Sequence, residues 1–187
     1  MAGLIEAERK YALAHGQPLP DLSAVVEPGA VSEFTLVATY YDAPDLRLTR
    51  AWKVIRHRVG GADAGWHVKL PGAKADQRIE LQLPAGPRRL PEELRRRVAD
   101  TLGGAPLHPV AVLRTKRRQQ ELLGPDGAVL AVACTDDVRS EVGGHRELWR
   151  EAEIELVTGD PALLDRIEAI LRAGGIARAA TGAKIAR

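Results

Sequence analysis

Hydrophobic and polar residues alternate along most of this chain, in short stretches rich in Val, Ile, Thr and Trp. A period of two is typical of β-strands that bury one face. The pattern predicts strands at residues 3–12, 34–42, 51–59, 65–70, 77–83, 110–123, 128–139 and 147–158. Turn sequences rich in Gly and Pro predict hairpins at 59–66, 123–128 and 140–147. The sheet is therefore expected to be mainly antiparallel.

Three segments break the alternation and predict helices. Residues 91–102 begin with a proline followed by two acids, and a Gly-Gly pair ends them, which are the usual start and stop signals of a helix. A second helix is expected from Asp160-Pro161 onward, where leucines and isoleucines form an apolar stripe. A shorter one is expected near 20–25, within a segment rich in Pro and Gly.

Charged residues gather on one face of the first and last strands. Glu6, Glu8 and Lys10 occupy every second position, so their side chains point the same way. The stripe returns near the other end with Glu153 and Glu155. Glu151 extends this second stripe, but the alternation alone does not place it inside or outside the protein.

Cations lie mainly on the strands between. Arg56 and Arg58 share one face of their strand, Lys69 follows on the next, and Arg78 shares a face with Glu80. An ordinary sheet with one solvated face is the simpler explanation. However, neighbouring like charges repel, and that cost requires a compensating partner. A metal ion would offset the acids and a polyphosphate the arginines. Closing the sheet into a barrel, with its apolar face outward under the helices, would place both clusters in one lumen.

Composition narrows the class of protein. The 187 residues predict one domain, 1–187, and 45% hydrophobic residues suffice for a core. The formal net charge of +2 argues against a nucleic-acid partner. No apolar run approaches the roughly 20 residues of a membrane span. Because Glu6 and Glu8 precede any apolar stretch, a secretory signal is not expected, and we predict a cytoplasmic protein.

Several other chemistries lack their motifs. The single cysteine, Cys134, excludes an intramolecular disulfide and cysteine zinc clusters, and is expected to be a buried thiol. The sequence contains no G-x-x-x-x-G-K-[ST] phosphate loop and no G-x-S-x-G nucleophile motif. None of the five histidines has the spacing of a metal-ligand pair.

The ordered series of charged motifs resembles that of CYTH domains, also called triphosphate tunnel metalloenzymes. E-A-E-R-K at 6–10 is similar to the ExExK signature of this family, and the agreement continues along almost the whole chain. Further matching segments are Tyr40-Tyr41-Asp42-Ala43-Pro44, Arg56-His57-Arg58, Trp66-His67-Val68-Lys69-Leu70-Pro71, Arg78-Ile79-Glu80, Thr115-Lys116-Arg117, Asp136, Glu153-Ile154-Glu155 and Lys184.

The resemblance implies a mainly β fold of the α+β kind. In it, an eight-stranded antiparallel barrel forms a charged tunnel with helices packed outside. It implies a divalent metal, Mg²⁺ or Mn²⁺, held by Glu6, Glu8, Asp136, Glu153 and Glu155. It implies phosphate binding by Lys10, Arg56, Arg58, Lys69, Arg78, Glu80, Arg117 and Lys184. Catalysis is expected from Glu6, Glu8, Lys10, Glu153 and Glu155.

Inorganic triphosphate is the expected substrate, hydrolysed to diphosphate and phosphate, because no nucleobase or thiamine pocket is evident. An aromatic residue precedes the R-x-R motif by two positions in the thiamine-triphosphatase branch, and Val54 stands there in this chain. Two alternatives remain open. One is an enzyme acting on ATP, either a nucleoside triphosphatase or a class IV type adenylate cyclase. The other is a non-catalytic module that binds polyphosphate or a nucleotide.

Two positions depart from the family pattern or stay unassigned. Ala183 stands where a serine usually precedes the C-terminal lysine, Lys184. A regular strand at 110–123 places Arg117 opposite Arg114, and a bulge would reverse which of them enters the lumen.

The last four residues resemble the junction at which many bacterial members continue into a helical CHAD domain. Such a continuation and a simple end of the protein are both open.

Overall fold

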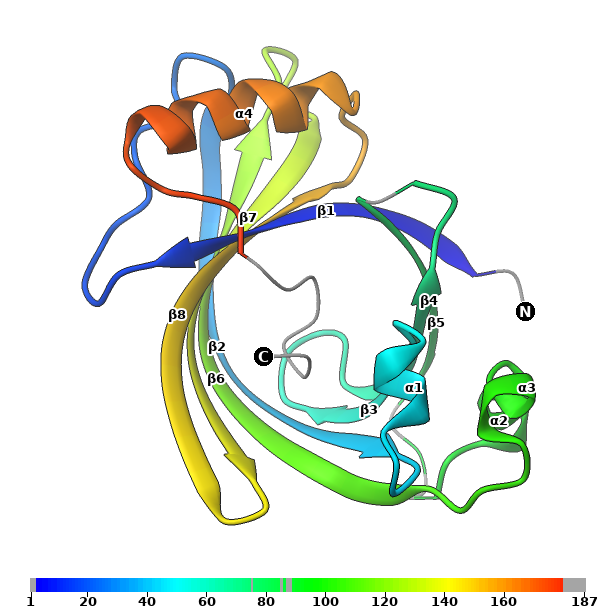
Figure 1. Cartoon of the computed structure of the whole chain (residues 1–187). Coiled ribbons are helices and arrows are strands. Elements are labelled where there is room, and N and C mark those ends of the chain that lie inside the picture. Colours follow the sequence, from blue (N-terminus) through cyan, green and yellow to red (C-terminus); the bar gives the residue numbers. More distant parts are fainter. Residues whose placement is uncertain (1–2, 75, 85, 87–88, 180–187) are drawn as a thin grey trace.

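Eight antiparallel strands close into a barrel in the order β1-β5-β4-β3-β2-β6-β7-β8 (Figure 1). The structure is a computed structural model, and it describes residues 3–74, 76–84, 86 and 89–179. The strands are β1 (Leu4–Leu13), β2 (Glu27–Asp42), β3 (Val54–Val59), β4 (Gly65–Pro71), β5 (Gln77–Pro84), β6 (His108–Leu123), β7 (Val129–Val142) and β8 (His145–Leu156). The expected barrel is confirmed, and its three predicted hairpins join β3 to β4, β6 to β7, and β7 to β8.

The first half of β2 was not expected from the sequence. β2 begins at Glu27 and pairs with β6 from Leu123 onward, across a register shift between Pro28 and Val31. The helix predicted near 20–25 is wrong, because residues 23–25 form a turn. The backbone N–H of Ser23 donates to the Asp21 carboxylate at 2.9 Å. This local bond competes with helical hydrogen bonding.

The predicted helix at 91–102 is two short helices, α2 (Glu92–Arg96) and α3 (Ala99–Leu102). Val98 interrupts them with a φ of −123° while its side chain is fully buried. Tertiary packing of this β-branched residue therefore outweighs the local helical pattern. The sequence pattern also missed α1 (Arg47–Arg50), whereas α4 (Ala162–Ala173) lies where the second predicted helix was expected.

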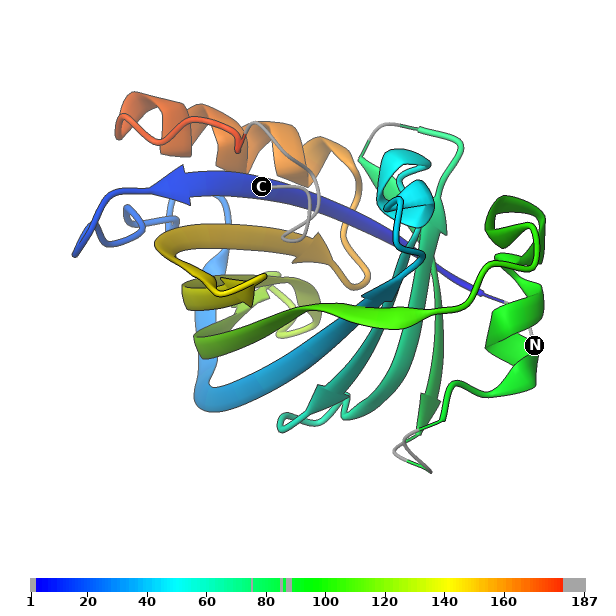
Figure 2. The same ribbon diagram turned by 60° about the horizontal axis from the view of Figure 1, so that its bottom comes forward.

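The helices cover the outer, apolar face of the barrel (Figures 1 and 2). From α4, Leu163, Leu164, Ile167 and Leu171 pack on the outward side chains of β1, β7 and β8. On another side, α1, α2 and α3 bury a second cluster with β3, β4 and β5. Because these outward positions alternate with the charged stripes of the same strands, stripes such as Glu6, Glu8 and Lys10 face the lumen.

One part of the lumen is filled by apolar side chains. Leu113, Val138 and Trp149 lie on the lumen face of their strands and pack with Ala38 and Tyr40 of β2. After α4, the chain returns to β1, where the backbone N–H of Ala12 donates to Ala177 at 3.0 Å. Among the described residues, no helix is both long enough and apolar enough to cross a membrane.

Candidate active site

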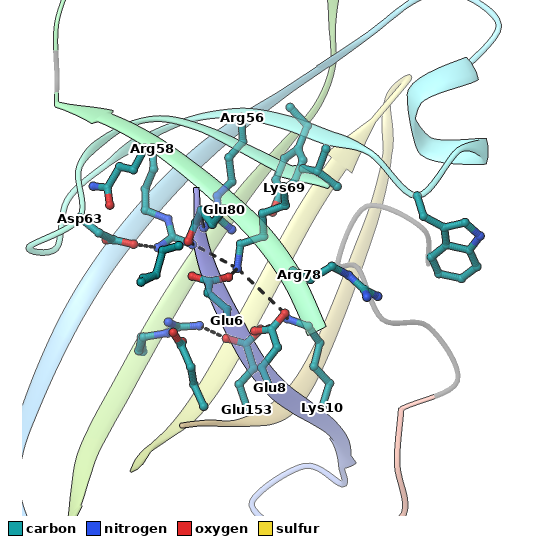
Figure 3. Close-up of a pocket in the computed structure, with 17 residues that line it drawn as sticks. Glu6, Glu8, Lys10, Arg56, Arg58, Asp63, Lys69, Arg78, Glu80 and Glu153 are labelled. Carbon is teal, nitrogen blue, oxygen red and sulfur yellow. Dashed lines mark hydrogen bonds and ion pairs between the residues drawn. The ribbon is translucent and has the colours of Figure 1, made fainter. Parts of the chain in front are cut away.

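The lumen contains a cavity of about 280 Å³ whose wall is mostly charged (Figure 3). Its acids come from β1, β5, β8 and the turn between β3 and β4, and its cations come from β1, β3, β4, β5 and β6. The lining residues are Leu4, Glu6, Glu8, Lys10, Tyr40, Trp52, Val54, Arg56, Arg58, Asp63, Lys69, Arg78, Glu80, Gln82, Arg117, Glu153 and Glu155.

The stripe on β1 faces this cavity as its alternation predicted. Glu6 accepts a hydrogen bond from Lys69 Nζ at 2.5 Å, and the same ammonium lies 4.0 Å from Glu8. Lys10 Nζ lies 3.6 Å from Glu8 and also donates to Glu153 of β8. The acids of β1 therefore pair with Lys69 of β4, and its lysine pairs with Glu153 of β8.

Arg117 decides which face of β6 enters the lumen. Its Nε and Nη2 donate to the two Asp136 oxygens at 2.8 and 2.7 Å, and Nη2 also donates to Glu153. Arg114 lies on the exposed face of the strand, so the regular strand is confirmed at this point. Burial by itself lowers the pKa of Arg117, but Glu153 and Asp136 raise it far above its ordinary value.

Glu80 organises the opposite wall. It lies 3.6 Å from Arg56 Nη2 and 3.8 Å from Lys69 Nζ. His67, which is 1% exposed, places Nδ1 at 2.7 Å from Glu80 and Nε2 at 2.8 Å from the backbone oxygen of Asp63. His67 thus links the carboxylate of β5 to the turn between β3 and β4.

Glu6, Glu80 and Glu155 carry shifted pKa values. Burial raises the pKa of Glu6 to about 8, and its hydrogen bond with Glu80 adds to the rise, while Lys69 opposes it. Burial would also raise the pKa of Glu80, but hydrogen bonds from His67 and Glu6 together with Lys69 lower it far below its ordinary value. The opposite shifts of the two pKa values favour the protonated form of Glu6 beside an ionised Glu80. Burial raises the pKa of Glu155 as well. The charge of Lys69 opposes this rise, and the charge of Glu8 adds to it.

The donor set fits a divalent cation such as Mg²⁺ or Mn²⁺. Asp136, Glu151 and Glu153 each present a carboxylate oxygen, and these atoms lie within 4.8 Å of one another. Hard oxygen ligands are the ones that both ions prefer. Burial, with a smaller contribution from neighbouring carboxylates, raises the pKa values of Glu6 and Glu155, and a bound cation would favour their ionised forms.

The structure brings together nearly all residues that the sequence nominated. Twelve of the thirteen lie in or beside the cavity, with Asp136 behind Arg117 and fully buried. Lys184 lies outside the described residues. Arg78 lines the cavity and donates to the backbone oxygen of Gln77 at 2.9 Å. Their catalytic and ligand roles stay predictions.

Three further residues belong to the site. Glu151, which the alternation left unplaced, is 5% exposed and accepts a hydrogen bond from Trp149 Nε1 at 2.7 Å, so it lies on the inner face of β8 with Glu153. Asp63 had no such signal, because a turn brings it to the site, whereas His67 shares a face of β4 with Lys69, so strand alternation could have indicated it. Cys134 is the buried free thiol that was expected, and burial raises its pKa to about 12.

A closed barrel with acids and cations facing one lumen defines the architecture, and comparison with known families agrees. Residues 4–187 match the CYTH domain, and the chain belongs to the CYTH family. An alignment of 204 positions with an uncharacterized protein of Mycobacterium tuberculosis shows 37% identity. It covers 98% of this chain and 40% of the relative. The chain thus spans about 40% of the length of the curated mycobacterial relatives that it matches.

Two further relatives carry functional names. Human thiamine-triphosphatase is 40% identical over 73 residues, which cover 38% of this chain and 29% of that enzyme. The crystal structure of a putative adenylate cyclase from Bacillus halodurans superposes with a TM-score of 0.60 at 18% identity, covering 99% of this chain and 97% of that one. At this identity the likeness supports the fold alone.

Proposed function

We propose that this domain hydrolyses inorganic triphosphate to diphosphate and phosphate, with Mg²⁺ or Mn²⁺ as cofactor. The observation that carries the proposal is the pair of arginines on β3. Arg56 and Arg58 are 9% and 7% exposed, line the cavity, and each keep a buried Nε without a hydrogen-bond partner among the described residues. Buried donors without partners are costly, and phosphate oxygens are acceptors of matching geometry and charge.

On the phosphate side, each cation would have its own task. Arg56 and Arg58 would bind one phosphoryl group with planar, forked donors, whereas the ammonium groups of Lys10 and Lys69 would act as point charges. Arg117 of β6, which only β2 separates from β3, would bind between these arginines and the acids of β8. Together these groups share the negative charge that spreads over a transferring phosphoryl group.

On the metal side, Glu6, Glu8, Asp136, Glu153 and Glu155 would hold the divalent ion, and Glu151 would add a further oxygen. When bound, such an ion polarises phosphate oxygens and lowers the pKa of a coordinated water. The proton on Glu6 would leave when the ion binds. The apolar cluster around Trp149 would exclude bulk water from that part of the lumen and so strengthen every charge interaction there.

The direct test is release of phosphate from inorganic triphosphate by the purified protein with Mg²⁺ or Mn²⁺. We expect Glu6→Ala to abolish turnover by removing a metal ligand, and Arg56→Ala to weaken it strongly by removing a phosphate donor. A wild-type rate no higher than that of both variants would refute the proposal. Tight binding without turnover under every metal would instead support a non-catalytic binding module.

A second candidate is an organic triphosphate, and Trp52 favours it. This residue lines the cavity, is 53% exposed and adopts a positive φ of 57°, an unusual conformation for a bulky residue. An exposed indole beside a phosphate site can stack on a flat ring such as a nucleobase or thiamine. A putative adenylyl cyclase from Hippeastrum, similar in fold with a TM-score of 0.50 and 17% identity, is described as having a dominant triphosphatase activity.

A substrate panel separates these candidates. We expect triphosphate to be turned over faster than thiamine triphosphate, ATP or long-chain polyphosphate. With ATP, cyclic AMP and diphosphate would indicate a cyclase, whereas ADP and phosphate would indicate a hydrolase. If Trp52→Ala slows an organic substrate but not triphosphate, the second candidate is favoured.

The full-length reading frame tests whether a CHAD domain follows residue 187.

A further inference from the structure

The ion pair between Arg58 and Asp63 is built differently from the other ion pairs of the lumen (Figure 3). Lys69 and Arg117 pair with carboxylates that project from strands of the barrel wall. Asp63 instead projects from the turn 60–64 between β3 and β4. In Figure 3, this pair lies on one side of the central group of Glu6 and Lys69. A carboxylate on a turn can leave its partner without deforming the wall.

Arg58 needs an anion where it lies. Its side chain is 8% exposed, and among the described residues its only ion pair is with Asp63. Burial lowers the pKa of Arg58, and the positive charge of the neighbouring Arg56 lowers it further. Its Nε donates to no partner in the described part of the chain. One monodentate carboxylate thus leaves this guanidinium incompletely satisfied.

Asp63 is free to move in a way that the wall carboxylates are not. Its side chain is 42% exposed, so it can rotate into water at little cost of desolvation. The turn depends on Gly60 and Gly61, whose φ values of 86° and 75° are unfavourable for other residues. His67 Nε2 lies 2.8 Å from the Asp63 backbone oxygen and anchors the turn there. Rotation of one side chain is therefore sufficient to release Arg58.

We propose that Asp63 is an affinity- and selectivity-determining residue, whose carboxylate occupies the place of a substrate phosphoryl group on Arg58 until a triphosphate displaces it. The inference rests on the proposed function, since it assigns Arg58 to phosphate. A terminal phosphoryl group has three oxygens and up to two negative charges, so it can satisfy more of the guanidinium than a carboxylate can. Weakly charged ligands cannot displace the Asp63 carboxylate from Arg58. Asp63 therefore reduces affinity for all anions and selects for strongly charged ones.

The test is the affinity for inorganic triphosphate, measured by calorimetry in EDTA so that no metal-dependent turnover occurs. Asp63→Asn keeps the shape of the side chain and removes its charge. We expect it to bind triphosphate about five- to thirtyfold more tightly, which corresponds to the loss of one competing charge-assisted hydrogen bond. Asp63→Glu retains the competitor and should not gain affinity. Asp45→Asn removes an equal charge from an exposed pair with Arg47 and should leave the affinity near that of the wild type.

Unchanged or weaker binding by D63N overturns the inference, and weaker binding would mean that Asp63 instead holds Arg58 in place for phosphate. Measurements at raised salt separate contact competition from long-range attraction, because only the latter is strongly screened. In kinetics, D63N should lower KM while kcat stays within about twofold.

A second readout does not depend on triphosphatase activity. Sodium sulfate should stabilise D63N against heat at lower concentrations than it stabilises the wild type. If the wild type hydrolyses no triphosphate but this difference is present, the proposed function fails and the role of Asp63 stands. If turnover is present without any gain in affinity, the role of Asp63 fails and the proposed function stands.

Discussion

Glu8 of β1 lies directly opposite Glu155 of β8 in the paired register of the two strands. Both side chains face the lumen, and the charge of Glu8 contributes to the raised pKa of Glu155. Like charges directly opposite each other destabilise a sheet by a few tenths to about 1 kcal/mol. The protein keeps this unfavourable pair at the seam where β8 meets β1. A divalent cation between the two carboxylates would convert the repulsion into shared coordination.

Glu155→Gln is therefore expected to change thermal stability in opposite directions with and without metal. In EDTA the variant should melt slightly higher than the wild type, because one of two repelling charges is removed. With Mn²⁺ it should lose most of the stabilisation that the wild type gains, because a metal ligand is lost. Differential scanning fluorimetry measures both effects, with the exposed Glu33→Gln as control. An equal Mn²⁺ shift in wild type and E155Q would contradict a metal role for Glu155.

The pKa of Glu6 predicts a pH dependence of stability in the metal-free protein. Its folded-state pKa is raised from 4.5 to about 8, so between these values the folded state holds a proton that the unfolded state has lost. The contribution of Glu6 to the free energy of unfolding is thus fully present below pH 4.5. It falls as the pH rises towards 8, by at most about 1.4 kcal/mol per pH unit.

Urea unfolding in EDTA from pH 5 to 8 tests this dependence. Glu6→Gln, which does not titrate, should flatten the decline over that interval. The exposed Glu33→Gln should retain it. A decline of equal slope in wild type and E6Q would show that another group carries the proton.

Arg117→Lys is expected to lower kcat/KM for triphosphate by at least about tenfold. A single ammonium cannot reproduce the two parallel hydrogen bonds to Asp136 and also contact Glu153. Arg114→Lys makes the same change on the outer face of the strand and should have little effect. Steady-state kinetics of both variants check the expectation. Equal losses of kcat/KM in the two variants would contradict the assignment of the Arg117 face of β6 to the functional site.

Ile167→Ala should destabilise the fold without altering the chemistry. Ile167 is fully buried between α4 and the barrel, outside the lumen, so truncation leaves a cavity that costs about 2–5 kcal/mol. The kcat of the folded protein should stay close to that of the wild type. Chemical denaturation and kinetics below the melting temperature measure the two quantities, with the exposed Arg166→Ala as control. A large loss of kcat would show that α4 influences the lumen.

The strands, and the face of each strand on which its charged side chains lie, were predictable from the sequence alone. Alternation in a strand is a local steric property, so Glu6, Glu8 and Lys10 had to share one face wherever β1 lay. The same reasoning placed Glu153 with Glu155 and Arg56 with Arg58. Local signals also located α4 and the hairpins, because turn residues and helix caps act within a few positions.

Only the tertiary structure decided which of these faces meet and what partners them. Closure of β1 onto β8 sets Glu8 against Glu155, and no local pattern specifies that register. His67 reaches Glu80 and Asp63 returns to Arg58 through contacts that depend on the folded barrel and its turns. Likewise, Val98 divides a helix that the sequence pattern predicted as continuous. Such outcomes depend on packing and charge balance summed over distant residues, whereas sequence periodicity reports only local preference.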